Sequence, residues 1–330
     1  MKKKTPLIDG ALSKIGSDFI AEKQNIGYSY YSNAYIVRDF SRYVEKHKQF
    51  AVADSMVSKA MVENWLLSHE NNAPGSICNL VKVIRQLAIF MNRNGMQAYV
   101  LPTAYAPKQS FGFTAYIFSQ KQLSLIFSAA DNITPTTISP LRHLTMPLLF
   151  RTIYACGLRS SEATGLRIRD VDLQNGIIHI NNSKFNKSRD IPIAESLCIR
   201  CEEYSKMVHK KSSADDFFFP NAYRDEYLTS TVYNVFRELL YICNIPRVNH
   251  GPRVHDLRHT YAVHVLKQWS LENKDLTSAL PLLCTYMGHA DLSGTQKYLQ
   301  LTADLYPHIV NRLEDFYTNQ EIKGGVYNER

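Results

Sequence analysis

Apolar residues recur at helical spacing through most of the first hundred positions of the chain. The clearest case follows Pro74-Gly75, where apolar positions repeat at intervals of three and four until Gly95 ends the pattern. The same reasoning predicts helices over about 11–23, 29–46 and 59–70. The N-terminal part is therefore predicted to be a unit of four helices.

The stretch 101–113 breaks this pattern and is the predicted linker. It contains Pro102, Pro107 and Gly112 and has no helical periodicity, as is typical of a connection between domains. A second module begins near Tyr116. We therefore predict two domains, a helical unit over residues 1–110 and a larger unit over 111–330.

The second module mixes the two periodicities. An apolar helix is predicted over 146–156, closed by Gly157. Residues 171–173 and 177–180 flank the turn signal Asn175-Gly176 and predict a β-hairpin, and a further strand is predicted over 190–193. From about Ala194 the chain is predicted to be helical again, apart from 217–220. The predicted fold class is mainly α with a small antiparallel β-sheet.

The charge of the chain favours a polyanionic partner. The net charge is +8, and residues 1–110 hold 14 Lys and Arg against 8 Asp and Glu, so most of the excess lies in the N-terminal unit. On the helix after Pro74, Lys82, Arg85 and Arg93 lie outside the apolar set. We predict that these cations bind DNA.

Export, membrane insertion and a cysteine-based site are not expected. The basic start Met1–Lys4 is not followed by an apolar core, and no run of about 18 apolar residues occurs. We therefore expect a cytoplasmic protein with no membrane partner. Cys198 and Cys201 form a CxxC pattern without a second pair nearby, so we interpret them as two thiols one helical turn apart.

Six side chains could together carry chemistry, although each alone has an ordinary structural explanation. They are Arg159, Lys184, His255, Arg258, His289 and Tyr298. Their local contexts are a Gly-Leu-Arg segment at Arg159, a His-Asp-Leu-Arg-His-Thr segment from His255, and Met-Gly-His ending at His289, with Tyr298 nine residues later.

This ordered series resembles the tyrosine recombinase (phage integrase) family, whose pattern is Arg, Lys, His-x-x-Arg, His or Trp, and Tyr. The resemblance covers most of residues 116–300. Two departures occur: Met287 stands where Leu is frequent, and the lysine turn lacks the usual glycines. Aligning the turn makes Lys184 the catalytic lysine, with Lys187 as a second candidate that also contacts DNA.

The resemblance implies a mechanism that physical chemistry makes reasonable. A phenol with an ordinary pKa of about 10 is a poor nucleophile at neutral pH unless cations or a base assist it. The resemblance makes Tyr298 the nucleophile, which would form a 3′-phosphotyrosyl link. Arg159 and Arg258 could hold the non-bridging phosphate oxygens without a metal.

The remaining roles also come from the resemblance. Lys184 would protonate the leaving 5′-oxygen, His255 would transfer protons, and His289 would hydrogen-bond the scissile phosphate. Glu162 would brace the arginine region, while Asp256 and His259 would orient or pack the motif. Neither metal nor ATP is expected.

The resemblance also implies the partners of the chain. The substrate is double-stranded DNA, clamped between a helical core-binding domain and the catalytic domain. The assembly would be a homotetramer on two DNA sites, with partner recombinases as a further option.

Three alternatives remain at this stage. His255 and His259 are four apart, as in helical zinc pairs, and His289 or Cys284 could complete a metallohydrolase site, but Asp256 stands where such a helix has Glu. A non-catalytic DNA-binding relative is the second alternative, and the full residue set argues against it. A type IB topoisomerase is the third, and the small helical N-terminal unit fits recombination better.

Overall fold

The structure is a computed structural model that describes residues 5–48, 57–107, 115–181, 188–247, 251–288 and 298. The chain divides into two compact units, Met1–Phe113 and Thr114–Arg330. This division falls close to the domain boundary predicted at residue 110. Each unit has a hydrophobic core of its own.

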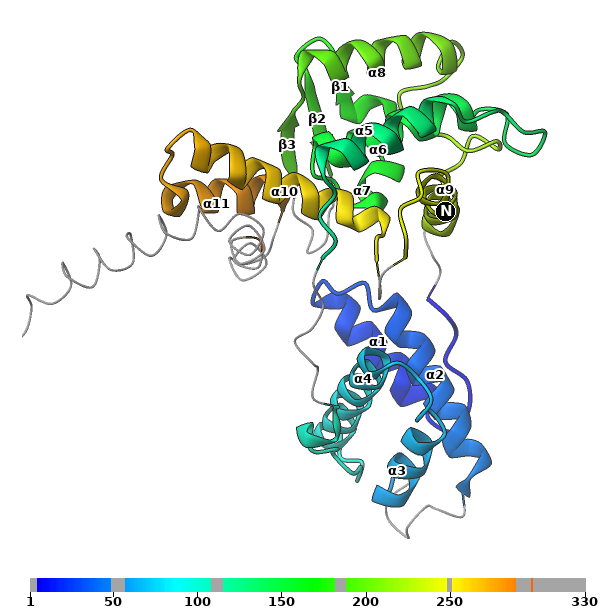
Figure 1. The fold of residues 1–330 in the computed structure, drawn as a ribbon. Helices are drawn as coiled ribbons and strands as arrows, with labels where there is room; N and C mark the ends of the chain where they lie inside the picture. The colour runs from blue at the N-terminus through cyan, green and yellow to red at the C-terminus, as the bar shows by residue number, and fades with distance from the viewer. Residues whose placement is uncertain are drawn as a thin grey trace, which may run out of the picture. The chain divides into compact units, whose positions relative to one another are not determined.

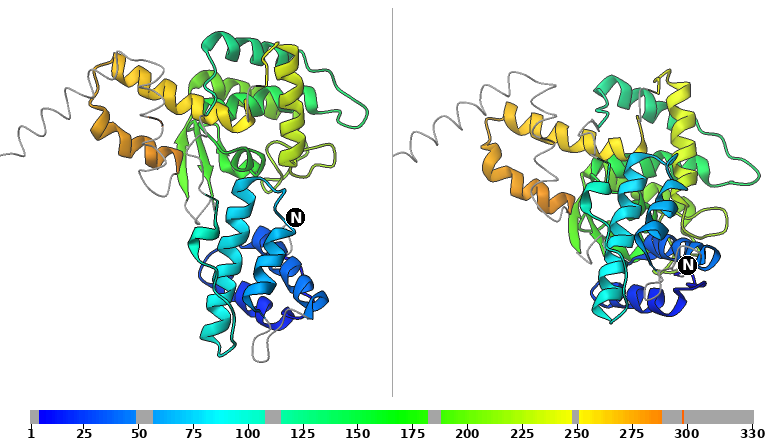
Figure 2. Two further views of the ribbon diagram at one scale, coloured as in Figure 1. Left: turned by 60° about the horizontal axis from the view of Figure 1, so that its bottom comes forward. Right: turned by 90° about the horizontal axis from the view of Figure 1, so that it is seen from below.

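The first unit consists of the four predicted helices, which the structure confirms. They are α1 (Ser13–Asn25), α2 (Tyr31–Lys46), α3 (Lys59–Leu67) and α4 (Pro74–Arg93). Helices α1, α2 and α4 pack against one another around a shared core, and α3 packs against α2 and α4 (Figures 1 and 2). Trp65 of α3 is fully buried there and donates a hydrogen bond to Asp39 of α2 at 2.9 Å.

Capping explains where α3 begins and ends. The Ser58 hydroxyl accepts a hydrogen bond from the Met61 backbone N–H at 3.2 Å, which satisfies one free donor of the first turn. At the other end, side chains of Ser68 and His69 bond the Trp65 carbonyl, so the helix stops earlier than predicted. The short helix η2 (Thr103–Tyr105) lies in the predicted linker, whose residues 108–113 are outside the described residues.

The second unit is built around α6 (Arg142–Ala155), which covers all but the last residue of the apolar helix predicted over 146–156. Because this helix is apolar on nearly all sides, it is buried among α5 (Gln120–Asp131), α8 (Glu195–Val208) and α10 (Val254–Leu271). The short elements α7 (Ser160–Thr164) and η3 (Ile168–Asp170) follow it directly.

The predicted hairpin and third strand form one antiparallel sheet in the order β1 (Val171–Asp172), β2 (Ile177–Ile180), β3 (Arg189–Pro192). Ile178 pairs with Val171 on one side and with Ile191 on the other, and Ile178 and Ile191 are buried. The fold class is therefore as predicted, mainly helical with a small antiparallel sheet (Figure 1).

The helical prediction after Ala194 was wrong for part of the chain. A non-helical segment, 209–228, separates α8 from α9 (Thr229–Ile242) and is much longer than the predicted break at 217–220. The reason is a tertiary contact: the Phe218 backbone N–H donates to the Leu166 carbonyl at 2.8 Å, and Phe217 bridges to Arg167. With Phe219 fully buried, this segment of turns and isolated bridges is held against the core.

Helices α10 and α11 (Leu276–Met287) lie side by side at the end of the second unit (Figure 1). An apolar cluster joins them, and Tyr298 belongs to it with only 3% of its surface exposed. Among the described residues, no helix has the length and apolar character needed to cross a membrane.

Candidate active site

Arg159 is positioned by the junction between α6 and α7. Gly157 ends α6 with a φ of +57°, and a Cβ there would lie 2.6 Å from the ring of Tyr261, so only glycine fits. The Glu162 carboxylate then accepts a hydrogen bond from the Arg159 backbone N–H at 3.0 Å. Glu162 thus fixes both the start of α7 and the position of Arg159. Arg159 lies at the helix start, as the sequence predicted.

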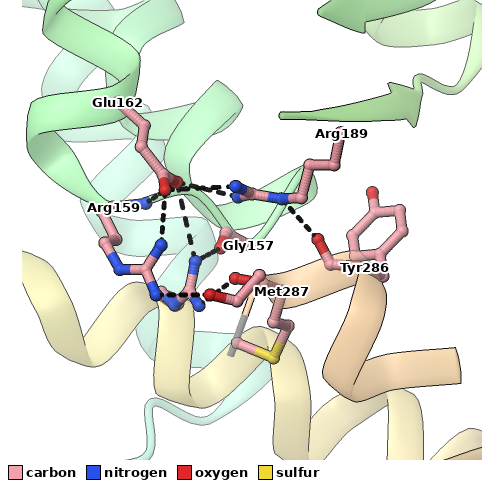
Figure 3. A network of polar contacts seen from close by, with 8 residues as sticks. Gly157, Arg159, Glu162, Arg189, Tyr286 and Met287 are labelled. Carbon is pink, nitrogen blue, oxygen red and sulfur yellow. Dashed lines mark hydrogen bonds and ion pairs between the residues drawn. The ribbon is translucent and has the colours of Figure 1, made fainter. Parts of the chain in front are cut away.

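Three arginines converge on Glu162, whose side chain is only 6% exposed (Figure 3). The guanidinium of Arg159 lies 2.5 Å from the carboxylate, that of Arg189 2.8 Å and that of Arg258 3.7 Å. Three cations around one anion leave the cluster with excess positive charge. We expect such a cluster to attract an anion such as a phosphate.

The same arginines bind the C-terminal end of α11, whose last carbonyls have no partner within the helix. Arg189 Nε donates to the Tyr286 carbonyl at 2.7 Å, Arg258 Nη2 to the Met287 carbonyl, and Arg159 Nη2 to the Gly288 carbonyl at 2.8 Å (Figure 3). Positive charge at a helix C-terminus is also favoured by the helix dipole. The cluster therefore orients the chain immediately before His289.

Arg258 is the most enclosed member of the cluster, with 1% of its surface exposed. It lies on α10, and its Nη1 donates to the Gly157 carbonyl at 2.6 Å. Burial, followed by the charge of Arg159, lowers the pKa of Arg258 to about 10, so the side chain is still charged at neutral pH. A buried charge held by fixed carbonyls is preorganised for an incoming anion.

Arg189 is the member that the sequence interpretation missed. The predicted strand began at Asp190, whereas β3 begins at Arg189. Alternation along the strand places Arg189 on the same face as Ile191, which is fully buried. A charged residue on the inward face of a strand indicates an internal partner, and this signal could have identified it.

His255 lies on α10 three residues before Arg258, as the motif predicted. Its ring reaches solvent, and it contacts the ring of His259 edge to face, with centroids 4.6 Å apart. Removal of water by the surrounding protein, and then the charges of Arg258 and Arg159, lower the pKa of His255 to about 4. The imidazole is therefore neutral at neutral pH.

Tyr298 is buried against α10, where its hydroxyl lies 2.9 Å from Nδ1 of His259. Burial raises the pKa of the Tyr298 phenol, while Arg258 and Arg159 act in the opposite direction. The phenol is therefore protonated at neutral pH. The structure thus brings together four of the six candidates: Arg159, His255, Arg258 and Tyr298. Lys184, Lys187 and His289 lie outside the described residues.

The three DNA-binding candidates on α4 differ in their surroundings. Lys82 is exposed. Arg85 is half-buried and donates a hydrogen bond to the Leu101 carbonyl, and Arg93 forms an ion pair with Glu22. Their contact with DNA stays a prediction, and Lys82 is the candidate whose charge is best presented.

The CxxC thiols are placed for packing. Cys198 and Cys201 lie on α8 as free cysteines, with Cys198 donating to the Leu173 carbonyl. Burial raises the pKa of Cys201 to about 12, which keeps this thiol protonated. Within the described part of the chain, no group of three His, Cys, Asp or Glu side chains is arranged to hold a metal ion.

Comparison with known proteins places the chain in a family. The phage integrase family matches residues 117–304. A putative integrase/recombinase y4rB of Sinorhizobium fredii is 24% identical over 90% of this chain and 95% of its own. Tyrosine recombinase XerC of Halalkalibacterium halodurans is 29% identical over 85% and 87% of the two chains.

Two solved structures share the fold. A XerH site-specific recombinase bound to palindromic difH substrate covers 80% of this chain and 74% of its own, at 19% identity and a TM-score of 0.60. The Tn1549 transposon integrase with a circular intermediate DNA covers 86% and 94%, at 14% identity and a TM-score of 0.62. The chain belongs to the phage integrase family and is a tyrosine-type site-specific DNA recombinase. The topoisomerase and non-catalytic alternatives are not favoured.

Arg189→Met is expected to disturb the arginine cluster, although Arg189 is not part of the family motif. It would remove one of the cations bound to Glu162 and the donor to the Tyr286 carbonyl. Breaking a buried ion pair should lower the free energy of unfolding by about 3 kcal/mol or more. DNA cleavage should also slow, since Glu162 and the end of α11, which both contact Arg159 and Arg258, would each lose the contact with Arg189. Thermal unfolding and single-turnover cleavage would measure the two effects.

Arg169→Met is the matched control, because both side chains of the Arg169–Asp215 ion pair are exposed to solvent. Exposed pairs contribute about 0–1 kcal/mol, so this variant should unfold and cleave like the wild type. Equal behaviour of the two variants would show that Arg189 has no role in positioning the cluster.

Proposed function

We propose that this recombinase cleaves and rejoins DNA through a 3′-phosphotyrosyl intermediate formed on Tyr298, with neither metal nor ATP in the reaction. The observation that carries the proposal is the position of the Tyr298 hydroxyl, beside His259 and within the field of Arg258 and Arg159. A buried phenol among guanidinium groups is the arrangement that attack on a phosphodiester requires.

The arginines supply charge stabilisation in this proposal. As the Tyr298 oxygen bonds to phosphorus, negative charge grows on the non-bridging oxygens, which Arg159 and Arg258 would hold. Since both side chains are fixed by backbone carbonyls, they need little reorganisation during the step. The bond to the 5′-oxygen breaks while the phosphotyrosyl bond forms, so a 5′-hydroxyl from another duplex can reverse the step.

The roles of the other candidates rest on the motif. Lys184 would protonate the leaving 5′-oxygen, and His289 would hydrogen-bond the scissile phosphate. His255, neutral in the free protein, would bind or relay a proton at the phosphate, and a bound anion would raise its lowered pKa. The position of Arg159, Arg189 and Arg258 at the end of α11 supports the role of His289, since it orients the preceding residue.

The two units have different roles in the proposed function. Residues 1–110 would form the core-binding unit and residues 111–330 the catalytic unit, together clamping DNA. The excess of basic residues in the first unit supports this division. The proposed assembly is a homotetramer on two DNA sites in the cytoplasm, with partner recombinases as the alternative source of protomers.

A covalent trap tests the proposal directly. The DNA flanking the coding region would be searched for inverted repeats, and a nicked duplex carrying such a repeat would be incubated with the protein in EDTA. We expect a covalent protein–DNA adduct, with digestion and mass spectrometry placing the linkage on Tyr298. An adduct on another residue, or a requirement for divalent metal, would contradict the proposal.

Lys82→Gln is expected to weaken DNA binding by the first unit with little effect on cleavage at saturating DNA. One lost phosphate contact should reduce the slope of log affinity against log salt by about 1. Lys206→Gln on α8, an exposed lysine in the second unit, is the control. Binding isotherms at several salt concentrations would measure both, and identical slopes in the two variants would remove Lys82 from the interface.

A further inference from the structure

We infer that His259 is a further catalytic residue of this recombinase, the general base that takes the phenolic proton of Tyr298. The family motif assigns the nucleophile, the arginines, the group that protonates the leaving oxygen and, in His255, a proton-transfer group at the phosphate. The contact between Nδ1 of His259 and the Tyr298 hydroxyl, 2.9 Å, adds a group at the attacking oxygen itself. The inference rests on the proposed function, because it requires Tyr298 to be the nucleophile.

The position of His259 follows from the helix. It lies one turn after His255 on α10, so both imidazoles project from the same side, and their rings meet edge to face. The rings of His259 and Tyr298 are also in contact, with centroids 5.4 Å apart. His259 is half-buried, so it can keep a fixed orientation toward the phenol while the proton leaves.

The nucleophile needs such a base. Burial raises the pKa of the Tyr298 phenol, and the opposing charges of Arg258 and Arg159 do not overcome that effect. A protonated phenol must lose its proton as its oxygen attacks, and an acceptor already within hydrogen-bond distance lowers the barrier to that transfer. An imidazole suits this role because its ordinary pKa lies near neutral pH.

The step balances without any further reactant. An electron pair of the Tyr298 oxygen forms the bond to phosphorus, and the phenolic proton passes to Nδ1 of His259, whose own proton is then on Nε2. The bond from phosphorus to the 5′-oxygen breaks, and that oxygen takes a proton from the general acid on the opposite side. In the reverse step the imidazolium of His259 returns its proton to the departing phenol.

The charged groups around the pair fit this proton transfer. Arg258, Arg159 and Asp256 shift the pKa of Tyr298. The ring of His255 contacts the ring of His259. Because the lowered pKa of His255 keeps that ring neutral, His259 can become positive without a second imidazolium against it. Asp256, fully buried at the start of α10, is among the groups that raise the pKa of the Tyr298 phenol, and burial raises its own pKa.

His259→Asn and His259→Ala provide the test. The asparagine amide can keep a hydrogen bond to Tyr298 but cannot accept its proton, and alanine removes the contact. We expect both variants to bind DNA normally and to form the Tyr298 adduct about 100-fold more slowly. His264→Asn is the matched control, because Nδ1 of His264 also bonds a tyrosine hydroxyl, that of Tyr154, at 3.0 Å on the same helix.

Two measurements separate proton acceptance from a merely structural role. In the His259 variants the rate should rise with pH across the neutral and alkaline range, on the order of tenfold per unit, because only ionised phenol reacts. The wild-type rate should fall on the acid side, because a protonated imidazole cannot accept the phenolic proton. Replacing Tyr298 by a more acidic fluorotyrosine should also recover part of the rate in His259→Asn, and hardly change the wild type.

A substrate with sulfur in place of the scissile 5′-oxygen identifies the end of the reaction at which His259 acts. A thiolate leaves without a proton, so this substrate should restore the rate of a Lys184→Ala variant. It should leave the His259 variants slow, because their defect is at the attacking oxygen.

The outcomes distinguish this inference from the proposed function. If the wild type forms the adduct on Tyr298 and both His259 variants cleave as fast as His264→Asn, the inference is overturned and the nucleophile stands. Full rescue of the His259 variants by the sulfur substrate would overturn it as well. If the wild type forms no adduct on Tyr298, the proposed function itself fails. Thermal unfolding of each variant would confirm that the rates are compared between folded proteins.

Discussion

Tyr298→Phe is expected to abolish formation of the covalent DNA adduct while the protein stays folded and bound to DNA. The substitution removes the hydroxyl alone, and the ring can keep its place in the apolar cluster between α10 and α11. Losing the nucleophile of a covalent enzyme costs on the order of 10⁶-fold in rate, so cleavage should fall to background. Half-buried His259 loses one hydrogen bond, a change of about 1 kcal/mol in stability.

The experiment compares adduct formation on a nicked duplex with binding of the same duplex. Tyr261→Phe is the matched control, because Tyr261 is a partly buried tyrosine of α10 that packs against the same cluster. This control should form the adduct at the wild-type rate. An adduct that persists in Tyr298→Phe would falsify the assignment of the nucleophile.

Arg258→Lys is expected to have the second largest effect, although it keeps the positive charge. An ammonium group cannot reproduce the planar fork that donates to the Gly157 and Met287 carbonyls and faces the phenol. Cleavage should therefore slow about 100-fold or more through lost transition-state stabilisation. A buried carbonyl left without its donor should also lower the free energy of unfolding by about 1–3 kcal/mol.

Single-turnover adduct formation and thermal unfolding would measure these two effects. Arg151→Lys is the control, since Arg151 is a largely enclosed arginine that binds Asp131 through both terminal nitrogens, away from the site. A substrate with a methyl group in place of one non-bridging oxygen needs less charge neutralisation and should reduce the difference between Arg258→Lys and the wild type. A wild-type cleavage rate in Arg258→Lys would remove Arg258 from the proposed charge stabilisation.

Local patterns were sufficient for most secondary structure, because periodicity reports which side of an element is buried. The helix after Pro74 and the strand over 177–180 were predicted with nearly the bounds that α4 and β2 have. The segment 209–228 was not, because its non-helical form depends on a backbone hydrogen bond from Phe218 to Leu166, far away along the chain. The local sequence gives no indication of that contact.

The functional residues divide in the same way. The motifs around Arg159, His255 and Arg258 could be recognised because each lies within one short segment whose order is typical of the family. Arg189 could not be recognised from a motif, since its importance comes from Glu162 and from the Tyr286 carbonyl. Its place on the inward face of β3 was the only local sign.

By itself the sequence determined the class of enzyme and the identity of the nucleophile candidate, because an ordered set of reactive residue types restricts the chemistry strongly. Only the tertiary structure decided how that chemistry is arranged. It placed three arginines from α10, β3 and the start of α7 around Glu162 and the end of α11, and it placed His259 against Tyr298. These contacts join residues that are distant in the chain. Folding buries charged groups and a phenol, and each buried polar group needs a partner inside the protein.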